Sequence, residues 1–239
     1  HTTMVCVSTI GVGQGHRWRA TLGAQTSRNS SVTTSYIAAR VLAFNAEAVN
    51  APGMSTSINE VVTITGTNFG PATTQNPVSA TYGARNSDRR GLAGSTFTAV
   101  LCEVTVAHTE MQCESVPGVG HHLEWELQVG SQPSWQNVSN VPFTSYAPPM
   151  LTGVGFAGTL RTSGGELVTL TGSGFGPVVD ANLVNASYVN WALSWLSELA
   201  GSVFSAPRCN VTTHDVEIVC QSSPGVGFDQ KWSLTVGDQ

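Results

Sequence analysis

The stretch VVTITGTNFGP at positions 61–71 recurs 106 positions later as LVTLTGSGFGP at positions 167–177. In both copies apolar residues alternate with threonines, which is the period of a β-strand with one buried face. Asn68 in the first copy stands where Gly174 stands in the second, and these residue types best tolerate a positive φ. Both stretches are therefore predicted to form a strand that ends in a left-handed turn.

Other blocks recur with a spacing of 107 positions. Cys6, Cys113 and Cys220 are spaced in this way, and each is followed by Gly-Val-Gly and then by a tryptophan. This predicts a repeat of about 107 residues, a normal length for one domain. The chain then divides into the C-terminal half of a repeat (1–36), a complete repeat (37–146) and a repeat that lacks its last strand segment (147–239). We expect it to be part of a longer repetitive protein.

Strand patterns dominate the rest of the chain as well. Short Val-rich runs are separated by Gly, Pro, Ser and Thr, which is typical of many short strands joined by turns. Three tryptophan segments show the same alternation of apolar and polar residues: Trp18-Ala20-Leu22, Trp125-Leu127-Val129 and Trp232-Leu234-Val236. The sequence therefore predicts an all-β fold.

One segment departs from the strand period. Its apolar residues have the spacing of a helix, and they are Trp191, Trp195, Leu196 and Leu199. The segment is either a local core that closes the sandwich or an anchor for the next domain or a neighbouring chain, since aromatic residues dominate interface energies. We treat these four residues as a candidate interface.

The five cysteines fit the repeat. Cys102 and Cys113 are 11 positions apart, and so are Cys209 and Cys220. In an antiparallel hairpin this odd separation places two residues directly opposite each other, within disulfide range. The sequence lacks the clustered Cys and His spacing of a zinc site. We predict two disulfides, and a partner for Cys6 that precedes position 1.

The sequence also contains N-glycosylation motifs. Asn-x-Ser/Thr triplets without proline occur at Asn29, Asn137, Asn185 and Asn210. Asn29 and Asn137 lie at nearly the same position of the repeat. Because disulfides are typical of oxidising compartments, we predict covalent N-glycans and an extracellular location, secreted or on the cell surface.

The composition argues against several classes of protein. Charged residues make up 10% of the chain and the net charge is −5, whereas nucleic-acid-binding proteins usually present a basic face. No apolar run approaches the roughly 18 residues of a transmembrane helix. We therefore expect no nucleic-acid partner and no membrane span within these residues.

No catalytic motif stands out. The glycine-rich residues 172–176 have the composition of a dinucleotide-binding loop, but such a loop precedes a helix, and here Pro177 follows. Neither a Gly-x-Ser-x-Gly elbow nor an Asp-x-Asp calcium loop occurs. His108 and His214 are predicted to lie in hairpin turns. We predict a protein that is not an enzyme, with no catalytic, cofactor-binding or metal-binding residues.

The order of these motifs resembles tandem IPT/TIG domains. The Thr-Gly-x-x-Phe-Gly-Pro strand, the cysteine pair, Pro-Gly-Val-Gly at 117–120 and Ser-Tyr-Ala-Pro-Pro at 145–149 carry the resemblance, which covers essentially the whole chain. It implies tandem immunoglobulin-like β-sandwiches. The version with the cysteine pair is similar to domains of large extracellular, multi-domain surface proteins of algae, protists and ciliated cells. The first copy departs from the pattern, because Ile10 replaces Pro117 and Ala38-Ala39 replace Pro148-Pro149.

These expectations lead to a function hypothesis and its alternatives. The first is a structural extracellular glycoprotein, a tandem-repeat rod or fibre (filament) subunit at or outside the cell surface, including a ciliary or flagellar surface. Its partners would be neighbouring repeats or further copies of itself, because residues 1–36 cannot bury a core of their own. The alternative is an adhesion or receptor-like module that binds a protein or polysaccharide. A third reading is an accessory domain of a secreted enzyme.

Overall fold

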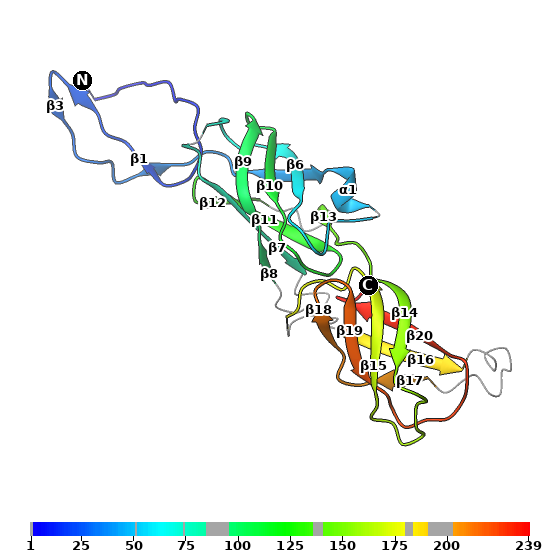
Figure 1. The fold of residues 1–239 in the computed structure, drawn as a ribbon. Coiled ribbons are helices and arrows are strands. Elements are labelled where there is room, and N and C mark those ends of the chain that lie inside the picture. The colour runs from blue at the N-terminus through cyan, green and yellow to red at the C-terminus, as the bar shows by residue number, and fades with distance from the viewer. Residues whose placement is uncertain are drawn as a thin grey trace.

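The computed structural model describes residues 2–50, 52–73, 75–84, 96–135, 141–179, 184–190 and 203–239. These residues form strands and one short helix, α1 (Ala46–Val49), so the protein is nearly all β, as predicted. Figure 1 shows three parts that follow one another along the molecule. We call them the N-terminal segment (residues 2–36), the central sandwich (strands β5 to β13) and the C-terminal sandwich (strands β14 to β20).

The central sandwich consists of two antiparallel sheets. One sheet has the order β5-β6-β10-β9, and the other has the order β12-β11-β7-β8, with β13 also paired to β11. The strands of the first sheet are β5 (Arg40–Phe44), β6 (Val61–Thr67), β9 (Val100–Val106) and β10 (Glu110–Glu114). Those of the second are β7 (Val78–Ala84), β8 (Thr96–Thr98), β11 (Leu123–Val129), β12 (Gln132–Pro133) and β13 (Phe143–Thr144).

The core of the central sandwich lies between its two sheets. Val62 and Ile64 of β6 are fully buried, and so are Trp125 and Leu127 of β11. Because successive side chains of a strand point to opposite faces, the alternating residues of β6 and β11 face the solvent side. The period-two pattern of the sequence therefore decides which residues form this core.

The C-terminal sandwich has matching strand orders, β14-β15-β19-β18 and β17-β16-β20. Its strands are β14 (Met150–Phe156), β15 (Leu167–Ser173), β16 (Val184–Asn190), β17 (Phe204–Ala206), β18 (Asn210–Thr213), β19 (Glu217–Gln221) and β20 (Gln230–Val236). Val168 and Leu170 of β15 are buried in its core, at the positions of Val62 and Ile64. One difference stands out among the described strands: β20 pairs only with β16, whereas β11 pairs with β7, β12 and β13.

The N-terminal segment contains two small ladders, β1 (His16–Arg17) with β4 (Thr33–Thr34) and β2 (Thr21–Leu22) with β3 (Gln25–Thr26). The expectation of one half-buried strand from Trp18 to Leu22 is wrong, because β1 ends before Trp18 and β2 begins after Ala20. Trp18 is 47% exposed. Within the described residues no second sheet covers this segment, so side chains such as Trp18 and Leu22 stay exposed.

The turns follow the predicted backbone chemistry. Asn68 has a φ of 63° and Gly174 a φ of 76°, which confirms the left-handed turn after each strand. His108, with a φ of 68°, lies in the β9–β10 turn, and Asp215, with a φ of 67°, has the same place in the β18–β19 turn. The structural counterpart of His108 is therefore Asp215, not the neighbouring His214.

Candidate functional site: the junctions between sandwiches

The structure contains both predicted disulfides. Cys102 is bonded to Cys113 with a Cα–Cα distance of 4.1 Å, and Cys209 is bonded to Cys220 with a distance of 4.0 Å. Cys102 lies in the outer strand β9, Cys209 directly precedes the outer strand β18, and Cys113 and Cys220 are buried in their cores. Cys6 is exposed and carries a free thiol. Its predicted partner stays a prediction.

Three of the four sequon asparagines lie among the described residues. Asn29, Asn185 and Asn210 are all exposed to solvent, which is what attachment of a glycan requires. Asn137 lies outside the described residues. N-glycosylation at these positions stays a prediction.

The candidate interface residues Trp191, Trp195, Leu196 and Leu199 also lie outside the described residues. A different tryptophan is exposed on the central sandwich. Trp135 is 55% exposed, and the guanidinium of Arg40 lies over its ring at 5.3 Å from the ring centroid.

The first junction joins the N-terminal segment to the central sandwich through Val12. This side chain packs against the core of the central sandwich, between Gly70 and Gly130. A Cβ atom at Gly130 would lie 2.6 Å from Cγ2 of Val12, which is closer than two non-bonded carbon atoms can approach. The valine is therefore accommodated because position 130 is a glycine.

The second junction joins the two sandwiches in the same way. Val119 belongs to the loop before β11 of the central sandwich, yet it is buried in the core of the C-terminal sandwich. A Cβ atom at Gly237 would lie 3.0 Å from Cγ2 of Val119 and 2.8 Å from the nitrogen of Gly120. Val12 and Val119 come from the same motif, as do Gly130 and Gly237, so equivalent residues build both junctions.

A glutamine closes each junction with a hydrogen bond. The side-chain Nε2 of Gln132 donates to the carbonyl oxygen of Tyr36 at 3.2 Å. The Nε2 of Gln239 donates to the carbonyl oxygen of Tyr146 at 2.8 Å. In both cases the amide of the following sandwich reaches back to the tyrosine that ends the preceding unit. The relative position of consecutive units is thus fixed by packing and by a polar contact.

The second junction has additional polar contacts. The hydroxyl of Thr56 donates to Oδ1 of Asp215 at 2.5 Å, and this carboxylate also accepts the backbone N–H of Gly176 at 3.2 Å. Nε2 of His214 lies 3.2 Å from the carbonyl oxygen of Ser57. The β18–β19 turn therefore docks onto the loop that precedes β6.

The aromatic core next to this junction is held by hydroxyl groups. The ring of Tyr82 stacks on Trp125 with centroids 4.3 Å apart, and its hydroxyl lies 2.9 Å from the hydroxyl of Tyr146. Burial raises the pKa of Tyr82 and also that of Tyr146, whose pKa the neighbouring Tyr82 raises further. Trp125 Nε1 donates to Oγ1 of Thr144 at 2.8 Å. Strand β13 and Tyr146 thus seal this end of the central sandwich.

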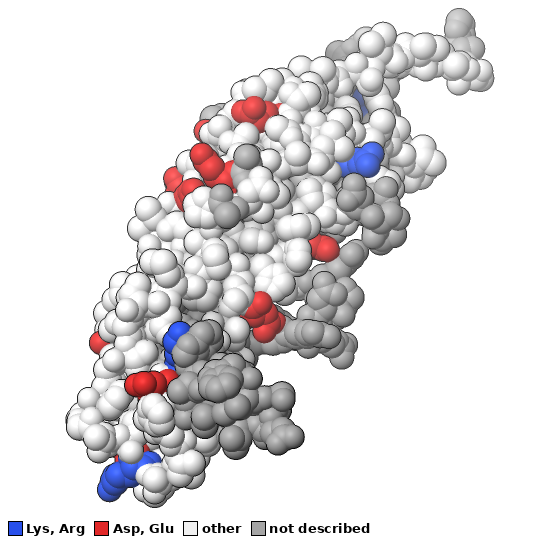
Figure 2. Space-filling model, turned by 90° about the vertical axis from the view of Figure 1, so that its right-hand side faces the viewer, with Lys and Arg blue, Asp and Glu red and all other residues white. Residues whose placement is uncertain are grey.

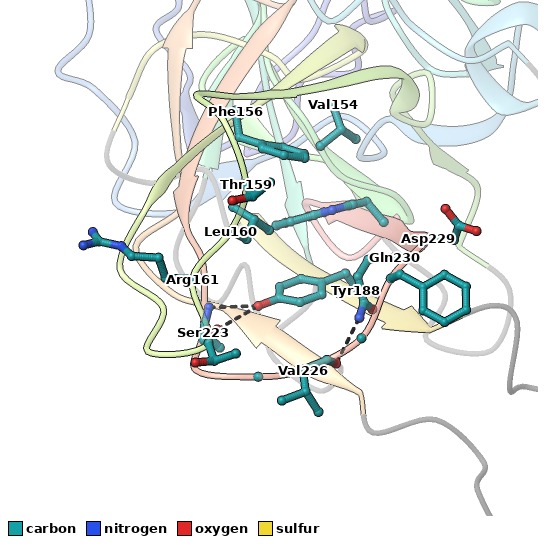
Figure 3. A pocket seen from close by; sticks show the side chains of 15 residues that line it. Val154, Phe156, Thr159, Leu160, Arg161, Tyr188, Ser223, Val226, Asp229 and Gln230 are labelled. Atoms are coloured by element: carbon teal, nitrogen blue, oxygen red, sulfur yellow. Dashed lines mark hydrogen bonds between the residues drawn. The ribbon is translucent and has the colours of Figure 1, made fainter.

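The same end of the C-terminal sandwich contains a cavity of about 540 Å³. Tyr188 and Trp232 stack there with centroids 4.4 Å apart, like Tyr82 and Trp125. Figure 3 shows Tyr188 and Phe156 facing the cavity, with Gln230 beside them. Oε1 of Gln230 is buried and has no hydrogen-bond partner within the described part of the chain.

An ion pair lies at the rim of this cavity. The guanidinium of Arg161, 2.5 Å from Oε1 of Glu166, and the hydroxyl of Ser222 lower the pKa of the Glu166 carboxyl to about 2. Residues 159–162 thereby stay close to β15 and β19.

Few side chains on the surface are charged. Figure 2 shows one face on which most side chains are neither acidic nor basic. The described ranges contain no group of three or more His, Cys, Asp or Glu side chains placed to hold a metal ion. Nor do these ranges include a helix with the length and hydropathy of a transmembrane segment.

No protein-family model matches the chain, and no curated protein sequence matches it either.

The junction residues are the functional residues that sequence reasoning missed. Val12 and Val119 belong to the repeated Gly-Val-Gly motif, and Gln132 and Gln239 are also 107 positions apart. Their recurrence at 107-residue spacing was the available signal. It did not reveal that the valine packs into the next sandwich, because that contact joins residues more than 100 positions apart.

Proposed function

We propose that the chain is part of a non-enzymatic structural glycoprotein outside the cell, in which tandem IPT/TIG sandwiches of the immunoglobulin-like type form a rod or fibre. The proposal combines the resemblance of the motifs with the way consecutive units are joined. The finer location, on a cell or ciliary surface, belongs to the same proposal.

The observation that carries the proposal is the junction that is built twice. Val12 packs at Gly130 and Val119 packs at Gly237, and a glutamine reaches back to the preceding tyrosine at both places. A contact that repeats along the chain places each unit on the next with the same geometry, as in solenoid and array proteins. Repetition of one fixed contact produces an extended rod, and such a rod serves a mechanical role.

Three further features support this role. The two disulfides brace the outer strands of each sandwich and are typical of secreted and cell-surface proteins. Asn29, Asn185 and Asn210 are exposed, so that glycans could coat the rod. The hydroxyl of Thr56 donates to Asp215 across the second junction, which adds a polar contact between the two sandwiches.

Immunogold electron microscopy of the source cells tests the location and the role. An antibody raised against residues 1–239 is expected to label filaments outside the cell, at a regular interval along each filament. Labelling of a cytoplasmic compartment, or of scattered single particles without filaments, contradicts the proposal. Pre-immune serum and antibody absorbed with the purified chain are the controls.

Small-angle X-ray scattering of the purified chain tests the rigid junction. The wild-type chain is expected to scatter as a single elongated particle. Val119→Asp places a carboxylate in the apolar socket, so we expect it to broaden the range of distances between the sandwiches. Val226→Asp is the matched control, because this valine comes from the same motif but is 73% exposed. Equal scattering of the two variants would contradict a rigid junction.

A further inference from the structure

Two adjacent histidines, His121 and His122, directly precede β11 of the central sandwich. They follow the Gly-Val-Gly motif, and the other two copies of this motif are followed by Gln14-Gly15 and by Phe228-Asp229. The strands around these three places correspond, so the fold itself does not require imidazole side chains here. The pair is particular to the central sandwich.

A left-handed backbone turns both imidazoles to the same side. The φ of His122 is 52°, and Gly15 and Asp229 have φ values of 71° and 52° at the same place in the other copies. Adjacent side chains of an extended strand point to opposite faces, and the turn removes this separation. The Nδ1 atoms of His121 and His122 lie 2.9 Å apart, and their ring centroids lie 4.8 Å apart. The sequence alone does not reveal this convergence.

Residues at and after β13 hold the turn in place. The backbone N–H of His122 donates to Oγ of Ser145 at 3.2 Å. The rings of His122 and Phe143 meet edge to face, with centroids 4.3 Å apart. The backbone N–H of Tyr146 donates to the carbonyl oxygen of Gly120 at 2.9 Å. The histidine turn is therefore braced on one side before any ligand arrives.

The other side of the pair is open to solvent. His122 is exposed and His121 is partly exposed. Among the described residues, no Asp, Glu or Cys joins them in a group of three side chains placed to hold a metal ion. An ion held by the two histidines therefore has solvent access, and water fills its remaining coordination positions.

The two facing nitrogens already share a proton. At 2.9 Å, Nδ1 of one histidine donates its hydrogen to the lone pair of the other Nδ1. Neutral imidazole nitrogens are also the commonest protein ligands of metal ions. When an ion binds, the shared proton moves to Nε2 of its own ring by exchange with water. Both rings then stay neutral, and each Nδ1 offers its lone pair to the ion.

The distance between the two nitrogens selects the kind of metal. Bonds from imidazole nitrogen to a metal are about 2.0–2.1 Å long, so two nitrogens at a right angle lie about 2.9 Å apart and at a tetrahedral angle about 3.3–3.4 Å apart. The Nδ1 atoms of His121 and His122 have the right-angle spacing. A modest rotation of each ring about its Cβ–Cγ bond aims both lone pairs at one point. Square-planar or tetragonal sites of nitrogen and oxygen ligands suit Cu(II) and Ni(II), and Cu(II) binds more tightly.

We propose that His121 and His122 form a binding site for a divalent copper ion, with their Nδ1 atoms as two adjacent ligands and water as the others. The backbone nitrogen of Gly120 lies 2.8 Å from the place that a Cβ atom at Gly237 would take. The copper ion is therefore bound beside the second junction. The site does not depend on the formation of a rod.

Isothermal titration calorimetry with Cu(II) tests the site. The chain is acetylated at its N-terminus, because a free terminal amine also binds copper. His121→Gln and His122→Gly introduce the residues of the N-terminal copy, so each keeps the turn and removes one ligand. Each variant should bind copper at this site about tenfold more weakly or worse than the wild type. His108→Gly is the matched control and should bind like the wild type, because His108 is a single exposed histidine at a φ of 68° between Ala107 and Thr109.

Electron paramagnetic resonance of the wild type identifies the ligands and does not depend on the folding of any variant. At less than one equivalent of Cu(II), the spectrum should show the copper electron coupled to two imidazole nitrogens, and each variant should lose this signal. A wild type without a copper site tighter than about 1 mM overturns the inference. Equal titrations of the wild type and both variants also overturn it. So does tighter binding of Zn(II) than of Cu(II), because zinc prefers a tetrahedral site.

Discussion

The central and C-terminal sandwiches place the same aromatic residues on the same strands, yet one core is closed and the other is open. Tyr82 stacks on Trp125 in the first, and Tyr188 stacks on Trp232 in the second, with nearly equal centroid distances. Trp125 is 1% exposed, whereas Trp232 is partly exposed beside a cavity. The difference shows that two facing sheets do not complete this core, and that β13 with Tyr146 supplies the closing layer.

The largest expected effect comes from removing the central tryptophan. Trp125→Ala should destabilise the central sandwich by about 3–5 kcal/mol, because it empties a closed core. Trp232→Ala should cost clearly less, since the indole already borders a cavity. Hydrogen exchange followed by mass spectrometry can read protection in β11 and β20 separately. Equal losses would mean that the C-terminal core is as closed as the central one.

Removing the disulfides should affect both sandwiches equally. Each bond closes a loop between cysteines 11 positions apart, so the chain-entropy contribution is about 3 kcal/mol in both. Cys102→Ala with Cys113→Ala, and separately Cys209→Ala with Cys220→Ala, should lower protection of β10 and of β19 by similar amounts. A much larger loss in one sandwich would show that its bond also holds the core in place.

Substitutions at two valines of the same motif should have smaller effects on stability and can be compared directly. Val119→Ala removes two buried methyl groups and should cost about 2 kcal/mol of C-terminal stability. Val226→Ala changes a 73% exposed residue of the same motif and should have no measurable effect in the isolated monomer. Hydrogen exchange at increasing urea concentrations gives the free energy of unfolding of the C-terminal sandwich for each of the two variants. If Val119→Ala left the stability of the C-terminal sandwich unchanged, the packing of Val119 would not support a rigid rod.

Removing the hydrogen bond between Trp125 and Thr144 should destabilise the central sandwich less than the substitutions above. Thr144→Val keeps the side-chain shape but removes the acceptor of the Trp125 indole, which should cost about 1–2 kcal/mol because the donor stays buried. Thr34→Val removes the acceptor of the exposed Trp18 and should cost close to nothing, because water can replace it. Thermal unfolding of each variant is the measurement.

The smallest expected effect is a pH dependence at the rim of the cavity. The pKa of Glu166 is lowered to about 2 by Arg161 and Ser222, whereas in the unfolded chain it returns to about 4.5. Its contribution to stability is therefore present above pH 4.5 and is lost as the pH falls from 4.5 toward 2. Protection of β15 should decline over this window in the wild type. Glu166→Gln should flatten the decline, and an unchanged profile would contradict the role of the carboxylate.

Local chemistry made much of the fold predictable. The alternation in residues 61–67 and 123–129 gave the buried faces of β6 and β11, because a strand's side chains alternate by geometry alone. The exchange of Asn68 for Gly174 gave the left-handed turns. The 11-residue separation gave both disulfides, since residues opposite each other in a hairpin are fixed by counting.

The same alternation failed in the N-terminal segment. Trp18 and Leu22 follow the pattern of Trp125 and Val129, yet both are exposed. Periodicity tells which face of a strand is apolar, but burial needs an opposing sheet. Within the described residues that sheet is present for β11 and lacking for the N-terminal segment, so identical patterns lead to different structures.

By itself the sequence determined the strands, the turns and the cysteine pairs, because each depends on residues within one hairpin. Only the tertiary structure decided that Val119 leaves its own sandwich and is buried in the next one, and that Gln239 reaches back to Tyr146. The Gln239–Tyr146 and Val119–Gly237 contacts join residues 93 and 118 positions apart, and their energy depends on how two completed sandwiches meet in space.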